Sequence, residues 1–474
     1  MLSYGKVKRI YQKSPEWAKG FLGVFTRFIP ISVMYGKGFK KLYKEALETQ
    51  HFSEEKLKER QNKLLRELIM HSYENVPYYT KLFKKLNLKP EDIKTKEDLK
   101  KLPILTKEDI RNNFDDLTAK NYKQFKPDLA HTSGSTGKKL YFYLDQKNRE
   151  KEYALVQRQL SNHSIDFDVK TANFRGDFVH SLGNKKSYEY NPIKKEMIFS
   201  TFDLDEEKIR KYISLLKKFK PGLIKGYPSA MIILSRHIMK NNIRLPKVGA
   251  ILTSSENMIK DDKDLIEKAF RSNVINWYGA SEYVVSAGEY SEERCMHFND
   301  DFSIVEVLDN HNLPVEPGKR GRIIATSLFN YSMPFIRYEQ EDLATLAEER
   351  CSCGRSLTQI KRIDGRTSDI ICSTDGREIP HTTYMHYWKH KIEEYIDDVI
   401  YVTTIQKSKY DFHIELLFEN AKCEECSVDL IEKEVKKLLG DKARIEFKIL
   451  EKIPSKEKWR FIKNEWKKAS CADN

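Results

Sequence analysis

From Leu129 onward, short apolar runs alternate with amphipathic helical patterns, and this alternation restricts the chain to a layered fold. A helical pattern at 206–219 is followed by an apolar run at 222–226, and a second at 230–241 by a run at 249–253. Apolar residues at helical spacing favour a helix with one buried face, whereas a short apolar run beside glycine favours a buried strand. Such alternation is typical of helices packed on a sheet, so the predicted fold class is α/β.

Regions of different character flank this alternation. Residues 50–120 have the pattern of helices separated by capped turns, and residues 301–345 contain β-type runs. After Gly365, the patterns follow the order strand, helix, two strands, helix and strand. Because 474 residues exceed one ordinary compact core, we expect two domains. They are a large multi-subdomain N-terminal domain, residues 1–365, with a helical first part and a β-rich subdomain, and a small C-terminal α+β domain, residues 366–474.

Two helix starts are marked by hydroxyl residues in the helical first part. Ser53 precedes a helical pattern at 54–70, and Thr95 precedes a shorter one at 96–102. Ser and Thr cap helices by accepting hydrogen bonds from free backbone N–H groups, and Pro103 is a helix stop. We therefore predict one long helix and one short helix here.

The formal net charge of +14 favours an anionic partner. ATP, coenzyme A, an acidic carrier protein, nucleic acid or an anionic membrane surface would each satisfy this preference. Lysine and arginine are spread along the chain rather than gathered in one arm, so nucleic-acid binding is not expected. A solvated basic surface accounts for the same charge without a partner.

Seven cysteines, an odd number with no signal-peptide pattern at residues 1–20, argue against a secreted disulfide framework and favour the cytoplasm. The most apolar early stretch, residues 17–34, is interrupted by Lys19, Arg27 and Pro30, so no transmembrane segment is predicted. Its aromatic and basic residues suit peripheral contact with a membrane surface, but a packed N-terminal helix explains the same pattern. No particular oligomeric state is implied.

The sharpest local motif is the loop HTSGSTGKKL at 131–140. Its glycines allow the backbone to approach a polyphosphate and turn N–H groups toward it, while its hydroxyls and lysine add donors and charge. A Walker A sequence needs four residues between its glycines and Ser or Thr after the lysine, so this loop is a different kind of phosphate site or an ordinary Ser/Gly turn. The predicted phosphate-binding residues are Thr132, Ser133, Gly134, Ser135, Thr136, Gly137 and Lys138.

Further short motifs follow the loop in a definite order. They are Ser254-Ser255-Glu256, then Tyr278-Gly279-Ala280-Ser281-Glu282, then Arg337 to Leu343, and finally Gly365-Arg366. Together with the loop, they resemble the ordered motifs of the adenylate-forming superfamily of acyl-CoA synthetases and ligases. The resemblance implies, in turn, an adenine-contacting turn, a Tyr-Gly-x-x-Glu motif, the segment with the ribose-binding Asp, and a hinge before a small mobile domain.

The resemblance also implies roles for single residues. Glu282 would supply a hard oxygen ligand to Mg²⁺ on the ATP phosphates, and Asp342 would accept hydrogen bonds from the ribose hydroxyls. Arg366 would contact ribose or phosphate. The implied nucleotide-binding set is Ser255, Glu256, Tyr278, Gly279, Asp342 and Arg366, with Glu282 as a magnesium ligand and catalytic residue.

Within the superfamily, the chain is most similar to the phenylacetate-coenzyme A ligase group and its relatives in capsular polysaccharide biosynthesis. Segments 75–79 and 99–111 resemble that group's N-terminal helical signature, and segments 353–355 and 362–366 resemble its later one. The likeness covers roughly residues 60–465.

Near the C-terminus, Ser455 to Arg460 resembles the superfamily's Gly-Lys-aromatic-Arg loop, which makes Lys458 the catalytic lysine and Lys456 the alternative. A mobile cation suits acyl adenylation because negative charge develops on oxygens in the transition state. The chain departs from the family pattern at Glu341 and Glu457, where glycine is usual, and at Ser368, where an acidic residue is common.

A second constellation pairs Cys295 with His297 and Cys351 with Cys353. Thiolates and an imidazole suit tetrahedral Zn²⁺, so these four residues are predicted to hold a structural zinc ion. The spacing of one residue is tighter than usual, and three unrelated reduced cysteines with a surface histidine are the alternative. The C-x-x-C pair at 423–426 has no second pair nearby and is interpreted as chance.

The resemblance implies an ATP- and Mg²⁺-dependent enzyme, an AMP-forming acid–thiol ligase. It would form an acyl- or aryl-adenylate, release pyrophosphate and transfer the acyl group to a thiol such as coenzyme A. Acyl or adenylyl transfer to a sugar acceptor in surface polysaccharide biosynthesis is one alternative, and a catalytically lapsed binding homologue is another. Tyr227, Trp277 and Tyr278 indicate a partly aromatic wall around a small-molecule carboxylate, without identifying the acid.

Overall fold

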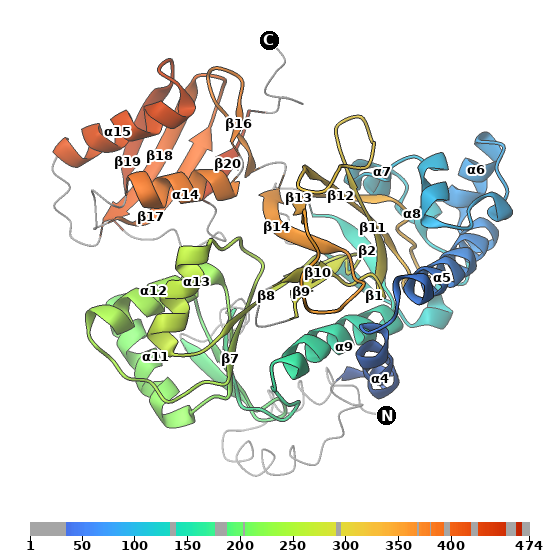
Figure 1. The fold of residues 1–474 in the computed structure, drawn as a ribbon, viewed down its shortest axis with the longest axis horizontal. Helices are drawn as coiled ribbons and strands as arrows, with labels where there is room; N and C mark the ends of the chain where they lie inside the picture. Colours follow the sequence, from blue (N-terminus) through green and yellow to red (C-terminus); the bar gives the residue numbers. More distant parts are fainter. Residues whose placement is uncertain are drawn as a thin grey trace.

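The computed structural model of the protein describes residues 35–132, 139–175, 187–201, 204–290, 295–366, 369–379, 381–392, 399–418, 425–451 and 461–466. Figure 1 shows a large α/β body and, beside it, a smaller group of strands and helices formed by the chain after Arg366.

The first part of the described chain is helical. Ser53 accepts a hydrogen bond from the Lys56 N–H and caps α5 as predicted, but the helix runs to Asn75 and ends where extended Val76 precedes Pro77. The short helix after Thr95 is a 3-10 helix of six residues, and Thr95 and Asp98 form a capping box at its start. The elements are α4 (Phe39–Thr49), α5 (Glu54–Asn75), α6 (Pro77–Lys85), η2 (Pro90–Asp92), η3 (Lys96–Lys101), α7 (Lys107–Asn112), α8 (Phe114–Leu117) and η4 (Tyr122–Phe125).

A mixed sheet of twelve strands forms the centre of the large body, in the order β11-β12-β13-β14-β10-β9-β8-β7-β6-β3-β5-β4. From β8 to β5 along this order the neighbouring strands are parallel, whereas β4 and the strands from β9 to β11 pair antiparallel. The strands are β3 (Thr171–Phe174), β4 (Tyr188–Asn191), β5 (Glu196–Phe199), β6 (Leu223–Gly226), β7 (Ala250–Ser254), β8 (Val274–Gly279), β9 (Ser286–Glu289), β10 (Met296–Phe298), β11 (Ser303–Leu308), β12 (Arg320–Ser327), β13 (Tyr338–Leu346) and β14 (Gln359–Arg366).

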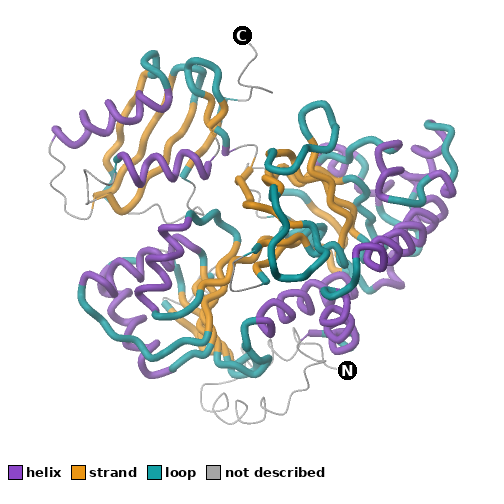
Figure 2. The backbone as a smooth tube through the Cα atoms, in the orientation of Figure 1, coloured by secondary structure: helices purple, strands orange, loops and turns teal. Residues whose placement is uncertain are grey.

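Helices cover both faces of the parallel half, as Figure 2 shows. On one face, Leu216 and Leu234 join Ile224 of the sheet in an apolar cluster. On the other face, Leu155 shares a second cluster with Leu252. The structure therefore confirms the predicted α/β class. The helices are α11 (Glu206–Phe219), α12 (Pro228–Lys240) and α13 (Lys260–Phe270) on the first face and α9 (Gln146–Asn162) on the second.

Helix α9 is fixed to the antiparallel half by buried ion pairs. The Arg158 guanidinium donates to Asp301 at 2.9 Å, and the Lys151 ammonium donates to the same carboxylate at 3.2 Å. Burial alone would raise the pKa of Asp301, but the two cations hold it below its ordinary value. All three side chains are fully buried, so removing either cation would leave buried negative charge undercompensated.

The chain after Arg366 has an apolar core of its own, in which Trp388 packs with strand residues such as Ile414. Its four-stranded sheet has the order β19-β18-β17-β20. The predicted order of strand, helix, two strands, helix and strand is present, with β16 and β20 in addition. The domain boundary at 365/366 stays a prediction. The elements are β15 (Ile371–Cys372), β16 (Glu378–Ile379), α14 (His381–Lys391), β17 (Val399–Gln406), β18 (Asp411–Phe418), α15 (Glu425–Leu439), β19 (Arg444–Ile449) and β20 (Ile462–Asn464).

Across the described residues, no helix combines the length and apolar character needed to cross a membrane. The apolar stretch at 17–34, on which the alternative of membrane-surface contact depends, lies outside the described residues.

Candidate active site

The predicted nucleotide motifs meet at the carboxyl edge of the parallel strands. Ser254 ends β7, Gly279 ends β8, and the two strands pair directly. In α/β sheets, ligands bind outside the carboxyl ends of the strands, where the topology changes direction. The direction changes here at β8, because β9 returns antiparallel. The antiparallel half can therefore bring its own side chains to the same edge.

Glu282 lies in the turn after β8 and is paired with a tyrosine of the antiparallel half. The Tyr338 hydroxyl donates to Glu282 Oε1 at 2.8 Å, and both side chains are buried. Burial raises the pKa of Glu282, while the Tyr338 hydrogen bond and the Lys107 ammonium oppose that rise. The site thus holds a carboxylate in a desolvated place and supports its charged form with one hydroxyl donor.

Asp342 is held between a hydroxyl and a guanidinium. The Tyr278 hydroxyl donates to Asp342 Oδ2 at 2.7 Å, and Arg366 Nε lies 3.7 Å from Asp342 Oδ1. Asp342 and Arg366 face each other in the β13–β14 register, which explains why residues 24 positions apart in sequence meet. Burial raises the pKa of Asp342, with Arg366 acting in the opposite direction. The structure therefore brings together the predicted residues Tyr278, Asp342 and Arg366.

Gly365, the other half of the predicted hinge motif, has a backbone that requires glycine. Its φ is +103°, and a Cβ at this position would lie 2.7 Å from Asn257 Nδ2 and 3.3 Å from His381 Cβ. Any side chain here would push the chain away from α14, which contains His381.

Lys107, on α7, is a site residue that the sequence did not single out. Its ammonium donates to Glu341 Oε2 at 2.5 Å. Glu341 stands where the family commonly has glycine, and its φ of 62° is the left-handed conformation that glycine adopts easily. The ion pair anchors this unusual residue. Lys107 lies inside the signature segment 99–111, which is the signal that could have identified it.

The Ser254-Ser255-Glu256 turn has a local structural use. Ser255 is left-handed, with φ 74°, and the Glu256 carboxylate accepts a hydrogen bond from the Ser229 N–H at 2.9 Å. Ser229 lies in the first turn of α12, so Glu256 compensates the free N–H groups and positive dipole of that helix start. The turn lies at the predicted edge, and its carboxylate is already engaged.

The predicted phosphate loop lies between two paired strands. β1 (Asp128–His131) and β2 (Tyr141–Leu144) form an antiparallel hairpin, and Thr132 pairs with Leu140 at the base of its loop. The Thr132 N–H donates to the Leu140 carbonyl at 3.0 Å, and Thr132 Oγ1 accepts from the Leu140 N–H at 3.1 Å. The other predicted loop residues lie outside the described residues. They are Ser133, Gly134, Ser135, Thr136, Gly137 and Lys138. Ser368, Lys456, Glu457 and Lys458 also lie outside the described residues.

A further buried acid lies close to the site, on α9. Glu152 has a pKa raised to about 8 by burial, although hydrogen bonds from Ser286 and Trp277 act against the rise. A Cβ on Gly279 would lie 3.3 Å from Glu152 Oε1, so this acid lies beneath the Tyr-Gly motif. Among the described residues, Glu152 Oε2 has no hydrogen-bond partner. The sequence did not indicate this residue.

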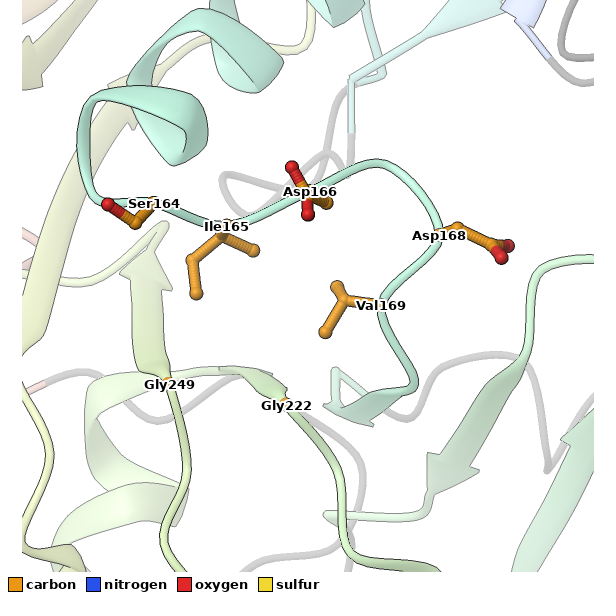
Figure 3. Close-up of a pocket in the computed structure, with 7 residues that line it drawn as sticks. All are labelled: Ser164, Ile165, Asp166, Asp168, Val169, Gly222 and Gly249. Atoms are coloured by element: carbon orange, nitrogen blue, oxygen red, sulfur yellow. The ribbon is translucent and has the colours of Figure 1, made fainter.

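An open pocket of about 370 Å³ lies elsewhere on the molecule. Figure 3 shows it between the segment after α9 and the chain at Gly222 and Gly249, with Ile165 and Val169 above the two glycines. Both glycines precede strands, β6 and β7, so the pocket lies at the amino edge of the sheet. It is therefore separate from the candidate site at the carboxyl edge.

Three of the four predicted zinc ligands lie together. The ligand atoms of His297, Cys351 and Cys353 are all within 4.8 Å of one another. Cys295, two residues before His297, is partly buried and lies outside this three-atom group. His297 is 1% exposed, so the alternative of a surface histidine is wrong.

No protein-family model matches the chain. It is 27% identical to Protein CapK of Staphylococcus aureus over 427 residues, which are 88% of this chain and 92% of CapK. It is 26% identical to the phenylacetate-coenzyme A ligase of Thermus thermophilus over 340 residues, 70% of this chain and 74% of that ligase.

Solved structures match over a similar extent. 2-Hydroxyisobutyryl-CoA ligase in the postadenylation state, in complex with R3-HIB-AMP, has a TM-score of 0.67 and 16% identity, covering 88% of this chain and 91% of that one. This match shows the fold, and the phenylacetate-coenzyme A ligases among the relatives support the class of AMP-forming ligases. Within it, the chain is related to the phenylacetate-coenzyme A ligase-like group that includes CapK, as its ordered motifs predicted.

Proposed function

We propose that this protein uses ATP to activate a small carboxylic acid. It forms an acyl- or aryl-adenylate, releases pyrophosphate and transfers the acyl group to a thiol such as coenzyme A. The observation that carries the proposal is the meeting of Glu282, Asp342, Tyr278 and Arg366 at one sheet edge, in the order that the family's motifs have along the chain. The phenylacetate-coenzyme A ligases among its relatives support the same reaction.

The two carboxylates suit different parts of the nucleotide. Asp342 is oriented by Tyr278 and Arg366 and can accept hydrogen bonds from ribose hydroxyls. Glu282 carries a hard oxygen ligand of the kind that Mg²⁺ prefers, and only one of its oxygens is bonded by Tyr338. When bound there, Mg²⁺ would neutralise polyphosphate charge. The donor set therefore fits the magnesium ion that the reaction requires.

In this proposal, the chain positions reactants and stabilises charge, and no enzyme nucleophile is needed. The carboxylate oxygen of the acid attacks the α-phosphate, the bond to pyrophosphate breaks, and pyrophosphate carries away the electron pair. Thr132 and the loop it closes would contact the phosphates, and Lys458 would approach the α-phosphate from the C-terminal part. In the second step, the acceptor sulfur attacks the acyl carbon and AMP leaves. The reducing cytoplasm supplies ATP and free thiols for both steps.

The acceptor has a second candidate. The match to CapK covers 88% of this chain, whereas the match to the Thermus ligase covers 70%. The name of CapK, unlike that of the ligase, specifies no thiol acceptor. If the acyl or adenylyl group passes to a sugar or amino sugar, the first half of the reaction and its residues stay the same. A lapsed homologue that only binds nucleotide would lack the first half altogether.

ATP–pyrophosphate exchange across a panel of aliphatic, aromatic and amino-substituted acids tests the activation step. We expect Mg²⁺-dependent exchange with at least one acid class and its loss in Glu282→Ala. The active acid is then incubated with coenzyme A or with amino sugars, and acyl-CoA or acyl-sugar is identified by mass spectrometry. Absence of exchange with every acid, despite ATP binding, would favour the lapsed homologue.

A further inference from the structure

The strongest cluster outside the nucleotide site consists of one imidazole and two thiols. His297 Nε2 lies 3.2 Å from Cys351 Sγ and 3.4 Å from Cys353 Sγ, and the two sulfurs are 3.0 Å apart. Around tetrahedral zinc, with bonds of about 2.0 to 2.3 Å, ligand atoms are separated by roughly 3.5 to 3.8 Å. Outward shifts of a few tenths of an ångström would therefore accommodate the ion.

The histidine is set up as a ligand by a backbone contact. His297 Nδ1 lies 2.9 Å from the Leu357 carbonyl oxygen. A carbonyl can only accept, so Nδ1 carries the proton and Nε2 of the neutral ring presents its lone pair to the two sulfurs. Metal-binding histidines commonly donate their other ring N–H in this way, which fixes both tautomer and ring orientation.

The two thiols reach the histidine because the chain between β13 and β14 folds back on β10. The Cys351 N–H donates to the side-chain oxygen of Gln359 at 2.7 Å, and the Phe298 N–H donates to the Thr358 carbonyl at 2.9 Å. The cluster therefore links β10 to a connection more than fifty residues away in sequence. A link of that kind would constrain the connection at 347–358, a described stretch that contains no helix or strand.

Cys295 is the fourth ligand in this proposal. It lies two residues before His297 in the β9–β10 hairpin, and its carbonyl accepts from the Tyr290 N–H at 3.2 Å. Residues two apart on an extended chain project to the same face, so the Cys295 thiol can turn toward the same ion. We propose that Cys295, His297, Cys351 and Cys353 bind one Zn²⁺ and that the ion pins the β13–β14 connection to β10.

The proposed site is structural because protein atoms fill all four positions. It is also remote from the nucleotide edge. β14 has eight residues and runs from Gln359, beside the cluster, to Arg366, so at about 3.3 Å per residue the two ends are on the order of 20 Å apart. The ion would support the strand that carries Arg366 without contacting the substrate.

Metal analysis of the full-length, reduced protein tests the proposal. We expect one equivalent of zinc, retained through gel filtration, and a lower Tm after removal by a chelator that zinc alone restores. Replacement by Co²⁺ should give the visible bands of a tetrahedral site and thiolate-to-cobalt charge transfer. Cys351→Ser and Cys353→Ser should lose the zinc equivalent, whereas Ser352→Ala, between them, should keep it.

The outcomes separate the parts of this proposal. A reduced, folded protein that neither binds Co²⁺ nor gains thermal stability with Zn²⁺ would overturn it. Charge transfer of unchanged intensity in Cys295→Ser would remove Cys295 from the ligand set. Should the cysteine variants fail to fold, titration of the wild-type protein with a chromogenic chelator still counts the ion. None of these measurements uses an acid substrate, so they stand independently of the adenylation assay.

Discussion

Replacing Tyr338 with phenylalanine isolates one contact of the candidate magnesium carboxylate. The change removes the hydroxyl that donates to Glu282 Oε1 at 2.8 Å and leaves the ring in its buried place. A hydrogen bond to a charged group contributes about 1.5 to 3 kcal/mol, and each pH unit corresponds to 1.36 kcal/mol. Its loss should move the acid limb of the adenylation profile upward by about one to two pH units.

The direction follows from which form of Glu282 the hydroxyl supports. Burial already raises the pKa of this carboxyl, and the Tyr338 hydrogen bond acts against that rise by favouring the charged form. Only the charged form is a good magnesium ligand. Without the hydroxyl the pKa rises further, so activity is retained at alkaline pH and is lost earlier as the pH falls.

The assay is ATP–pyrophosphate exchange from pH 5.5 to 9 at a magnesium concentration below saturation. Saturating magnesium should narrow the difference, because binding of the cation competes with the proton. Tyr79→Phe is the matched control, since Tyr79 is also buried and its hydroxyl donates to the Pro334 carbonyl at 2.9 Å. It should lose stability without a shift of the profile. Identical profiles for Tyr338→Phe and the wild type, or equal shifts in both variants, would refute the reasoning.

Three other predictions concern the nucleotide, the lysine loop and a buried acid. Asp342→Ala should weaken Mg²⁺-ATP binding at least about tenfold in calorimetric titration, because it removes a charged acceptor. Gly134→Val should also weaken binding, because its side chain would block the approach of the backbone to phosphate. Unchanged affinity in both variants would exclude the nucleotide site. Lys458→Ala should reduce ATP–pyrophosphate exchange about a hundred- to thousandfold, while consumption of added acyl-AMP survives. Lys456→Ala should reduce exchange much less. Loss of exchange in Lys456→Ala but not in Lys458→Ala would shift the loop assignment by two residues. Glu152→Gln should stabilise the fold increasingly as the pH rises from 4.5 toward 8, by on the order of a few kcal/mol at pH 8, because the folded state holds a proton that the unfolded state releases over that interval. Denaturant unfolding at both ends of that interval measures it, and a pH-independent difference between variant and wild type would contradict it.

Local pattern was sufficient for most elements of the fold. The helix predicted at 206–219 is α11 with the same bounds, because its apolar spacing and its acidic first turn act within the segment itself. Prediction was weaker where tertiary context decides. The two-residue strand β16 has no periodicity to detect, and α5 continues to Asn75, beyond the end predicted for it at residue 70.

The site divides in the same way. Motif order identified Glu282, Asp342 and Arg366, which the structure collects at one edge. Tyr338 and Lys107 lie inside the motif segments 337–343 and 99–111 but were not singled out, because their roles depend on pairing across 56 and 234 positions, respectively. The sequence also could not show that a predicted residue is already hydrogen-bonded within the protein, as Glu256 is to the Ser229 N–H.

The junction between the two halves of the sheet determines the electrostatics of the site. The parallel half ends in Tyr278 and Glu282, and the antiparallel half returns Tyr338, Asp342 and Arg366 to the same edge. Each carboxylate therefore receives its hydroxyl donor from the opposite half: Tyr338 donates to Glu282, and Tyr278 donates to Asp342. Separation of the halves would remove both donors while leaving every motif intact in sequence. Arg366, the last residue of β14, is also the main cation opposing the raised pKa of Asp342. A change in backbone direction at the end of β14 therefore alters the charge environment of the proposed ribose-binding carboxylate.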